Sequence, residues 1–306
     1  MNYTLHQLKV FLKIVEFQSI TKASEALFLT QPAVSIQLKR LQDQFEIPLT
    51  EVIGRQLYIT DFGSKIAEVS RNILREADAI KTTIDQYNGL LTGKIIVSTV
   101  STGKYIIPYF LTGFMKKYPG VEMVVDVSNR EKVLESLAGN ESDFSLVSVL
   151  PENTPVNKID LMENRLYMVA SSRIHKGKLT PASLANETII LREKGSATRK
   201  AMEQYLEKYN ISYKKSMVLV SNEAVKQAVL AGIGFSIMPL IGLRNEIAND
   251  SLLICPMKDL PIITSWNLIY DERKKLSPAS TELISYINAH KQDVVGEYFD
   301  FDAFDS

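Results

Sequence analysis

Hydrophobic residues in the N-terminal third of the chain recur at intervals of three and four positions, the period of an amphipathic helix. A first helix is predicted from the apolar face Leu5, Leu8, Phe11, Leu12 and Val15. Residues 20–27 predict a second, shorter helix, and a tight break follows it. A third helix is predicted from the stripe Val34, Leu38, Leu41 and Phe45. Two short helices joined by a tight break are typical of a helix-turn-helix.

The third helix has a defined start and a polar outer face. Thr30 or Gln31 can cap its free amides, and Pro32 has no amide to donate. A capped helix with such a face can enter the major groove of DNA, with Gln31 and Ser35 on base edges and Lys39 or Arg40 on phosphates. The alternative is a helical hairpin inside an ordinary bundle. Candidate DNA-contacting residues are Thr30, Gln31, Pro32, Ser35, Gln37, Lys39, Arg40 and, from the segment that follows, Arg55.

Strand-like alternation follows the third helix. Gly54 predicts a turn, and Leu57 and Ile59 alternate with polar residues, which predicts a two-stranded wing with Arg55 at its tip. The helices and the wing form a compact module, the expected first domain, at residues 1–60.

Residues 61–91 predict one long helix. Its apolar positions fall on two heptad lines, Ile66, Ile73, Ile80 and Tyr87, and Ala77, Ile84 and Leu91. A heptad seam on an otherwise charged helix favours a two-stranded coiled coil, and thus a homodimer or, as a dimer of dimers, a homotetramer. The alternative is a helix packed on its own domain.

Beyond residue 92 the pattern changes to alternating strands and helices. Strands are predicted at 95–100, 121–127, 144–149, 166–170, 188–191, 217–220, 235–238 and 263–270. Helices are predicted at 106–118, 132–138, 197–209, 223–230 and 282–290. This order predicts a parallel, doubly wound α/β sheet in two lobes. The acidic and aromatic stretch at residues 294–306 is expected to be a solvated tail.

Composition narrows these interpretations. The 306 residues are 45% hydrophobic and 23% charged, which describes a soluble globular protein of two or three domains. A formal net charge of zero means that DNA binding must use locally placed cations. The single cysteine, Cys255, fits a reducing cytoplasm, and we expect neither a secretory signal nor a membrane span.

One specific pattern runs through the predicted helix-turn-helix: Ser19, Thr21, Ala23, Ala26, Leu27, Thr30, the run Gln31-Pro32-Ala33-Val34-Ser35, Leu38 and Leu41. In this pattern the chain resembles the LysR-type transcriptional regulators. The resemblance implies an α/β protein with an N-terminal all-α winged helix-turn-helix at 1–60, a dimerising linker helix at 61–91 and a two-lobed periplasmic-binding-protein-like effector domain at 92–306. Lobe I is expected at 92–161 and 267–306, and lobe II at 162–266. Implied partners are double-stranded DNA, a small-molecule effector and a second copy of the chain.

Candidate ligand-binding side chains follow several predicted strands. Ligands bind α/β sheets at the carboxyl ends of strands, near the first turns of helices. The candidates there, which the resemblance places in an effector cleft between the lobes, are Ser101, Thr102, Ser148, Ser196, Thr198 and Asn222. With Arg199 nearby, and no carboxylate leading any of these loops, they favour a small, at least partly anionic ligand. For any one of them alone, the alternative is a helix cap.

An enzymatic function is not predicted. Gly232-Ile233-Gly234 lacks the third glycine of a nucleotide loop and precedes a strand instead of following one. His6, His175 and His290 are scattered, so no catalytic residue, metal ligand or cofactor is expected. The competing hypothesis is an α/β enzyme or solute-binding protein whose N-terminal helices form an interaction module.

Overall fold

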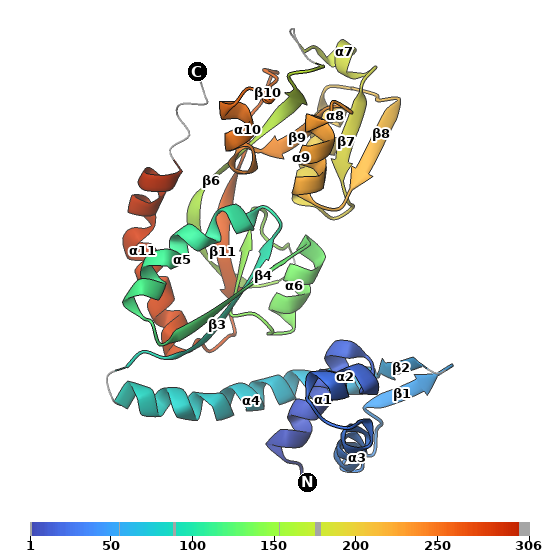
Figure 1. Cartoon of the computed structure of the whole chain (residues 1–306), viewed down its shortest axis with the longest axis vertical. Helices are drawn as coiled ribbons and strands as arrows, with labels where there is room; N and C mark the ends of the chain where they lie inside the picture. The colour runs from blue at the N-terminus through green and yellow to red at the C-terminus, as the bar shows by residue number, and fades with distance from the viewer. Residues whose placement is uncertain (1, 55, 88–89, 153, 175–178, 300–306) are drawn as a thin grey trace. The chain divides into compact units, whose positions relative to one another are not determined.

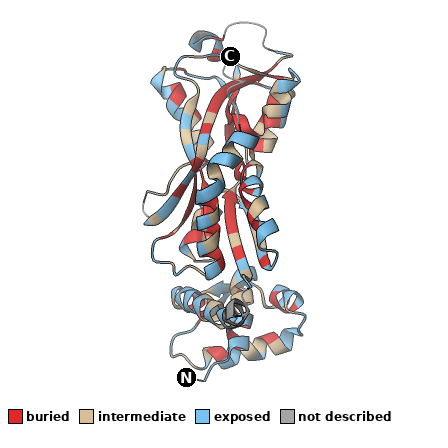
Figure 2. Cartoon of the chain, turned by 90° about the vertical axis from the view of Figure 1, so that its left-hand side faces the viewer, coloured by how far each residue is buried: buried red, intermediate tan, exposed pale blue. Residues whose placement is uncertain are grey.

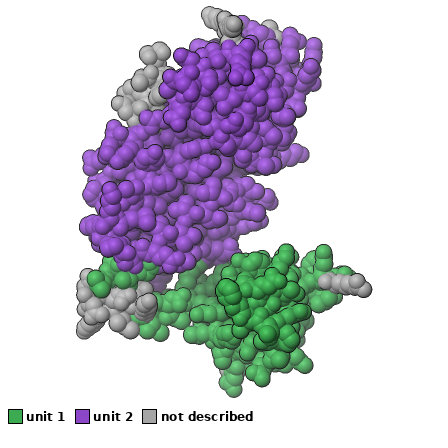
Figure 3. All heavy atoms as spheres, viewed as in Figure 1, with its two compact units in different colours: residues 1–93 green, residues 94–306 purple. Residues whose placement is uncertain are grey.

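The computed structural model describes residues 2–54, 56–87, 90–152, 154–174 and 179–299. The chain divides into two compact units, Met1–Gly93 and Lys94–Ser306 (Figure 3). Within the described ranges, no helix combines the length and apolar character required to cross a membrane.

Unit 1 is a helical module with a β-hairpin. It contains α1 (Leu5–Phe17), α2 (Ile20–Ala26), α3 (Gln31–Gln42), β1 (Thr50–Ile53), β2 (Gln56–Ile59) and α4 (Asp61–Tyr87) (Figure 1). Its core is formed where α1 and α3 bury Phe11, Ile14, Val34 and Leu41 completely. The predicted winged helix-turn-helix is therefore confirmed, and its hairpin turns at Gly54, whose φ is +56°.

Helix α4 differs from its prediction. It ends at Tyr87, so Leu91 is not helical. Ile66 and Ile73 pack against the core of unit 1, because α1 lies against this part of α4, while Ile80 is 65% exposed. The first half of the predicted seam thus belongs to its own unit. The side chains of Ile84 and Tyr87 lie outside the described residues.

Unit 2 contains two lobes. Lobe I holds β3 (Gly93–Val100), α5 (Ile107–Lys117), β4 (Val121–Ser128), α6 (Arg130–Ala138) and β5 (Phe144–Val147), with a 3-10 turn at Gly103–Tyr105. Lobe II holds α7 (Pro181–Leu184), β7 (Thr188–Arg192), α8 (Ala197–Lys208), β8 (Lys215–Leu219), α9 (Asn222–Leu230), β9 (Ser236–Pro239), α10 (Arg244–Ala248) and β10 (Leu252–Ile254), with a 3-10 turn at Leu240–Gly242. Strands β6 (Val156–Ser171) and β11 (Ile262–Asp271) run between the lobes, and α11 (Pro278–Tyr298) lies against α5 of lobe I (Figure 1).

The sheet of unit 2 is mixed. Its strand order is β10-β6-β11-β5-β3-β4, with β9 also paired to β6, while β7 and β8 form a separate parallel pair. Strands β3 and β5 are parallel, but β11 is antiparallel to both β5 and β6. The prediction of a parallel sheet was therefore wrong for the strands that join the lobes. They run in opposite directions because the chain crosses to lobe II along β6 and returns along β11.

The joining strands pair with each other along most of their length. Lobe I pairs with β11 at Asn267–Ile269, and lobe II pairs with β6 at Leu166–Val169. Between these segments, Trp266 of β11 lies opposite Met162 of β6, where the register shifts by one residue. Trp266 is completely buried.

Each side of the lobe II sheet carries its own core. Alternate residues of β6 and β7 point to opposite faces, so Met168 and Leu191 pack with α8 while Val169 and Ile190 pack with α9. Buried residues run along the strands of unit 2, as Figure 2 shows. Helices on both faces are the arrangement expected of a doubly wound fold.

The C-terminal stretch is not wholly a solvated tail. Helix α11 continues to Tyr298, and Phe299 is buried, with its ring centroid 5.2 Å from that of Tyr109 and 6.0 Å from that of Phe110 on α5. Arg244 of lobe II also donates from Nη1 to the carbonyl oxygen of Tyr298, at 2.6 Å. The aromatic residues that looked like tail residues therefore fix the end of α11. Residues 300–306 lie outside the described part of the chain.

Candidate functional site

The helix-turn-helix is built by side-chain caps at both helix starts. The Ser19 hydroxyl accepts from the Lys22 amide at 3.3 Å, and the Thr30 hydroxyl accepts from the Ala33 amide at 3.4 Å. Pro32 is in the first turn of α3, where its missing amide leaves no hydrogen bond unmade. Phe28 turns the chain with a φ of +53°.

The predicted DNA-contacting residues lie along α3 and its start. Gln31, Ser35 and Lys39 are spaced by four and therefore share one face of the helix. Lys39 and Arg40 are exposed, and neither forms an ion pair with a described residue. Thr30, Gln31 and Pro32 are exposed, Ser35 and Gln37 are half-buried, and Arg55 lies outside the described residues.

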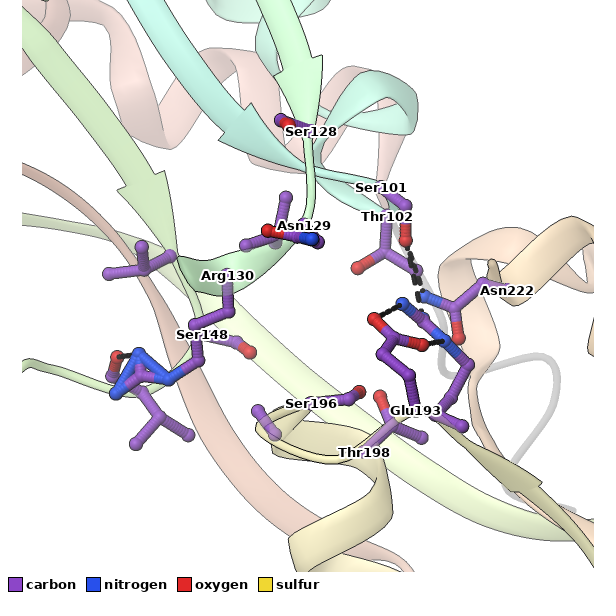
Figure 4. Close-up of a pocket in the computed structure, with 15 residues that line it drawn as sticks. Ser101, Thr102, Ser128, Asn129, Arg130, Ser148, Glu193, Ser196, Thr198 and Asn222 are labelled. Carbon is purple, nitrogen blue, oxygen red and sulfur yellow. Dashed lines mark hydrogen bonds and ion pairs between the residues drawn. The ribbon is translucent and has the colours of Figure 1, made fainter. Parts of the chain in front are cut away.

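A cavity in unit 2 brings together all of the predicted effector-binding residues (Figure 4). It lies where β3, β5 and β7 end and where α8 and α9 begin. Its lining includes the predicted Ser101, Thr102, Ser148, Ser196, Thr198 and Asn222, together with Ser128, Asn129, Arg130, Arg192 and Glu193. The role of these residues in binding stays a prediction.

Ser101 is the central hydrogen-bond acceptor of this cavity. Its Oγ, from lobe I, accepts from Asn222 Nδ2 at 3.0 Å and from Arg192 Nη1 at 3.3 Å, both from lobe II. Asn222 Oδ1 is buried and has no hydrogen-bond partner. The lobes therefore meet through polar groups that still have acceptor capacity.

Several hydroxyls of the cavity are not used as helix caps. Ser196 immediately precedes α8 and is 7% exposed, yet its side chain does not cap the helix. Thr102 is 5% exposed, and its hydroxyl also has no partner among the described residues. Such buried hydroxyls beside the free amides of a helix start are suited to hold a polar or anionic ligand.

The charges differ from the prediction. Arg199 donates from Nε to Glu203 at 2.7 Å and from Nη1 to the Arg192 carbonyl oxygen at 3.0 Å, and it does not line this cavity. The cations that do are Arg130 and Arg192, and a carboxylate, Glu193, lies with them. The expectation that no carboxylate leads any of these loops was therefore wrong, because Glu193 immediately precedes the loop that opens α8. The search of strand ends and helix starts that found the hydroxyl residues would have found these residues too, since Arg192 ends β7 and Arg130 begins α6.

Arg130 faces two cavities. Its guanidinium makes long contacts to the carbonyl oxygens of Val149 and Leu150, at 3.4 and 3.3 Å, and its burial lowers its pKa from the ordinary value. The cavity at Ser101 has a volume of about 30 Å³, and a neighbouring one of about 390 Å³ is lined by Arg130, Lys194, Ser196, Arg199 and Lys200, among others. Arg130 and Ser196 line both, so the two cavities adjoin.

Nothing resembling a metal centre is found in the described part of the chain, where no three His, Cys, Asp or Glu side chains could hold a metal ion together. Gly232, with a φ of +80°, follows the end of α9 and leads towards β9, as expected of a helix C-terminus. His175 lies outside the described residues.

Comparison with known proteins gives concordant matches over the whole chain. Residues 5–64 match the family described as "Bacterial regulatory helix-turn-helix protein, lysR family", and residues 88–292 match "LysR substrate binding domain". The chain is 37% identical to the HTH-type transcriptional activator CmpR of Synechocystis sp., over 96% of this chain and 97% of that protein. It is 35% identical to a RuBisCO operon transcriptional regulator of Acidithiobacillus ferrooxidans, over 95% of each. The solved regulatory domain of Synechocystis PCC6803 CcmR, in complex with 2-PG, is 31% identical, with a TM-score of 0.61, and covers 66% of this chain and 99% of that one.

Proposed function

The chain belongs to the LysR family of DNA-binding transcriptional regulators, and we propose that its effector is a small phosphorylated anion bound between the lobes of unit 2. The cavity that gathers Arg130, Arg192, the start of α8 and the unpartnered hydroxyls of Thr102 and Ser196 carries this proposal. The lining contains two arginines and one carboxylate, Glu193, which pairs with Arg192. A guanidinium binds phosphate or carboxylate through paired hydrogen bonds.

The ligand of a relative supports the same chemistry. The CcmR regulatory domain, 31% identical to this chain, was solved with 2-PG, which is 2-phosphoglycolate. That molecule carries a phosphate and a carboxylate, so it needs cations and donors at both ends. Arg130 and Arg192 come from different lobes, and both line the cavity together with its hydroxyl residues. We therefore take 2-phosphoglycolate as the first ligand to test.

The roles of the three segments of the chain follow those implied by the family. Residues 1–60 bind double-stranded DNA, residues 61–91 pair two copies of the chain, and residues 92–306 bind the effector, with lobe I at 92–161 and 267–306 and lobe II at 162–266. Gln31 and Ser35 read base edges, Lys39 and Arg40 contact phosphates, and Arg55 contacts DNA from the wing. The protein acts in the cytoplasm and catalyses no reaction.

Separation of the two activities tests this proposal. Thr102→Ala and Ser196→Ala each remove a hydroxyl that no described residue uses, so folding should be preserved. Each should weaken 2-phosphoglycolate binding in calorimetry by about tenfold to 150-fold, the usual value of a hydrogen bond to a charged group. DNA binding without effector, followed by fluorescence anisotropy, should stay unchanged.

The control is Thr112→Ala. Thr112 is also a hydroxyl residue of lobe I, but it donates to the Pro108 carbonyl on the exposed side of α5. The Thr112→Ala variant should keep both 2-phosphoglycolate binding and DNA binding intact. Loss of DNA binding in folded Thr102→Ala and Ser196→Ala, or full 2-phosphoglycolate affinity in both, would contradict the assignment of the cavity.

A further inference from the structure

The guanidinium of Arg192 is already occupied by a neighbouring carboxylate. Glu193 accepts from Arg192 Nε at 2.8 Å and from Nη2 at 2.7 Å, and Nη1 donates to Ser101 at 3.3 Å (Figure 4). The Arg192 side chain is only 6% exposed and that of Glu193 is 21% exposed. This is the bidentate geometry that an anionic ligand would use on the same edge of the guanidinium.

A buried cation requires a partner whether or not a ligand is present. An unpaired guanidinium at this depth would be costly, because it loses its hydration without gaining a countercharge. Glu193 supplies that countercharge in this structure. The Nε–Nη2 edge accommodates one carboxylate or phosphate, so Glu193 and an incoming anion cannot both hold it.

The volume of the cavity leads to the same conclusion. At about 30 Å³ it has room for little more than a water molecule, whereas ligand pockets usually measure roughly 300–1,000 Å³. The adjoining cavity, at about 390 Å³, is large enough, and Lys194 and Lys200 line it. Of these two lysines, Lys200 is paired with Glu152 at 3.5 Å, and Lys194 has no partner among the described residues.

We propose that Glu193 is a built-in competitor of the effector, a residue that occupies Arg192 in the free protein and must leave before an anion can bind. This inference rests on the proposed function and adds a determinant of affinity and selectivity to it. Binding exchanges one carboxylate for another anion at Arg192. A ligand with a single carboxylate gains little from the exchange, while a phosphate, with its charge of about −1.5 to −2, gains more. Glu193 therefore makes the cleft select phosphorylated ligands over unphosphorylated ones.

Calorimetry on the full chain tests the competition. We compare the wild-type protein with Glu193→Gln, which removes the charge and keeps the shape, and titrate each with 2-phosphoglycolate and with glycolate. Glu193→Gln should bind 2-phosphoglycolate about tenfold tighter, since one charged hydrogen-bonded competitor is removed. The ratio of the affinity for 2-phosphoglycolate to that for glycolate should fall at the same time.

Glu163→Gln is the matched control. Glu163 also pairs with an arginine, Arg165 at 3.1 Å, but it lines neither of the two cavities. Its replacement should leave both affinities unchanged. Glu193→Ala repeats the test if the glutamine variant folds poorly, and its melting temperature should rise more on adding 2-phosphoglycolate than that of the wild type.

The outcomes separate this inference from the proposed function. Tighter binding in Glu193→Gln, whether or not the wild type binds measurably, supports both. Wild-type binding with equal or weaker binding in Glu193→Gln overturns the competition and leaves the effector class standing. Absence of binding in both proteins overturns the effector class and, with it, the competition.

Discussion

Individual hydroxyl residues at helix starts have two different uses in this molecule. Ser221 caps α9 by accepting from the Ala224 amide at 3.1 Å, and Thr30 caps α3 in the same way. Ser196 occupies the equivalent position at α8, but its hydroxyl leaves the cap unmade and lines the cavity. A cap stabilises a helix by about 1 kcal/mol, so this site forgoes a small stabilisation that a bound ligand could restore.

Gln31 provides a prediction at the residue scale. It is exposed at the first turn of α3, on the same face as Ser35 and Lys39. Gln31→Ala should cost roughly 1–3 kcal/mol of binding to the preferred DNA sequence and relax sequence selectivity, because a base-edge contact is lost. Lys39→Ala should instead weaken binding to all DNA sequences alike and lower the salt dependence of that binding. Anisotropy titrations on specific and scrambled DNA, at several salt concentrations, measure both effects.

The control for these variants is Lys13→Ala, since Lys13 lies on α1 and is paired with Glu16 at 2.6 Å. Unchanged selectivity in a folded Gln31→Ala protein would show that Gln31 does not read bases.

Some of the site could be predicted residue by residue, and some could not. The hydroxyl and amide residues were found because strand ends and helix starts are visible in the hydrophobic pattern. The spacing of four between Arg199 and Glu203 on a predicted helix favours their pairing, but the pairing of Arg192 with Glu193 at the end of a strand follows no such pattern. Each of these arginines has acidic residues within reach along the chain, and only the packing of the two lobes decides which guanidinium faces the cavity.

At the scale of elements, α4 combines two kinds of surface. Its first half is part of the core of unit 1, where Ile66 and Ile73 are packed, whereas Ile80 is 65% exposed. An isoleucine exposed at a heptad position of a long helix is available to pair with a second copy of the chain. The predicted pairing of two chains therefore depends on the second half of the helix.

Replacing these isoleucines one at a time separates the two surfaces. Ile73→Glu should lower the free energy of unfolding of unit 1 by roughly 1–3 kcal/mol, because a charge would enter a packed position. Ile80→Glu should leave unfolding nearly unchanged but weaken dimers more than about tenfold, and DNA binding with them. Urea denaturation and analytical ultracentrifugation measure the two quantities. A dimer of unchanged affinity in Ile80→Glu would place the pairing surface elsewhere.

The C-terminal end of α11 gives a second element-scale prediction. Phe299 is 3% exposed and lies against Tyr109 and Phe110. Phe299→Ala should lower the free energy of unfolding of unit 2 by roughly 3–5 kcal/mol, the usual cost of emptying a buried phenylalanine site. Glu297→Ala, two residues earlier and exposed, should change it little. Equal stabilities of the two variants in urea denaturation would mean that this end of the helix contributes no packing.

Strand β6 was predicted less well than the other long strands, for a physical reason. Strand β6 spans Val156–Ser171, but only its second half has an apolar run. The first half carries Asn157, Lys158 and Asp160 and is held as a strand by pairing with β11, about a hundred residues away in sequence. Pairing over such a distance leaves no local pattern, so the antiparallel connection between the lobes was missed.

At the scale of the whole molecule, the division into two compact units predicts that unit 2 is autonomous. Its cavity is lined entirely by residues of that unit. A fragment of residues 94–306 should therefore unfold cooperatively and bind 2-phosphoglycolate within about threefold of the full chain, while binding no DNA. Circular dichroism and calorimetry test both properties. A folded fragment without ligand affinity, beside a full chain that binds, would mean that unit 1 contributes to the site.

Trp266 gives the molecule an optical reporter of its own. It is the chain's single tryptophan, it is completely buried, and it lies at the register shift of β11 between the segments that pair with lobe I and with lobe II. Its indole nitrogen has no hydrogen-bond partner, so a small twist of the two strands would change the polarity around the ring. All tryptophan emission from the protein therefore originates at the strands that join the two lobes. A rearrangement of the lobes can be followed by fluorescence without any added label.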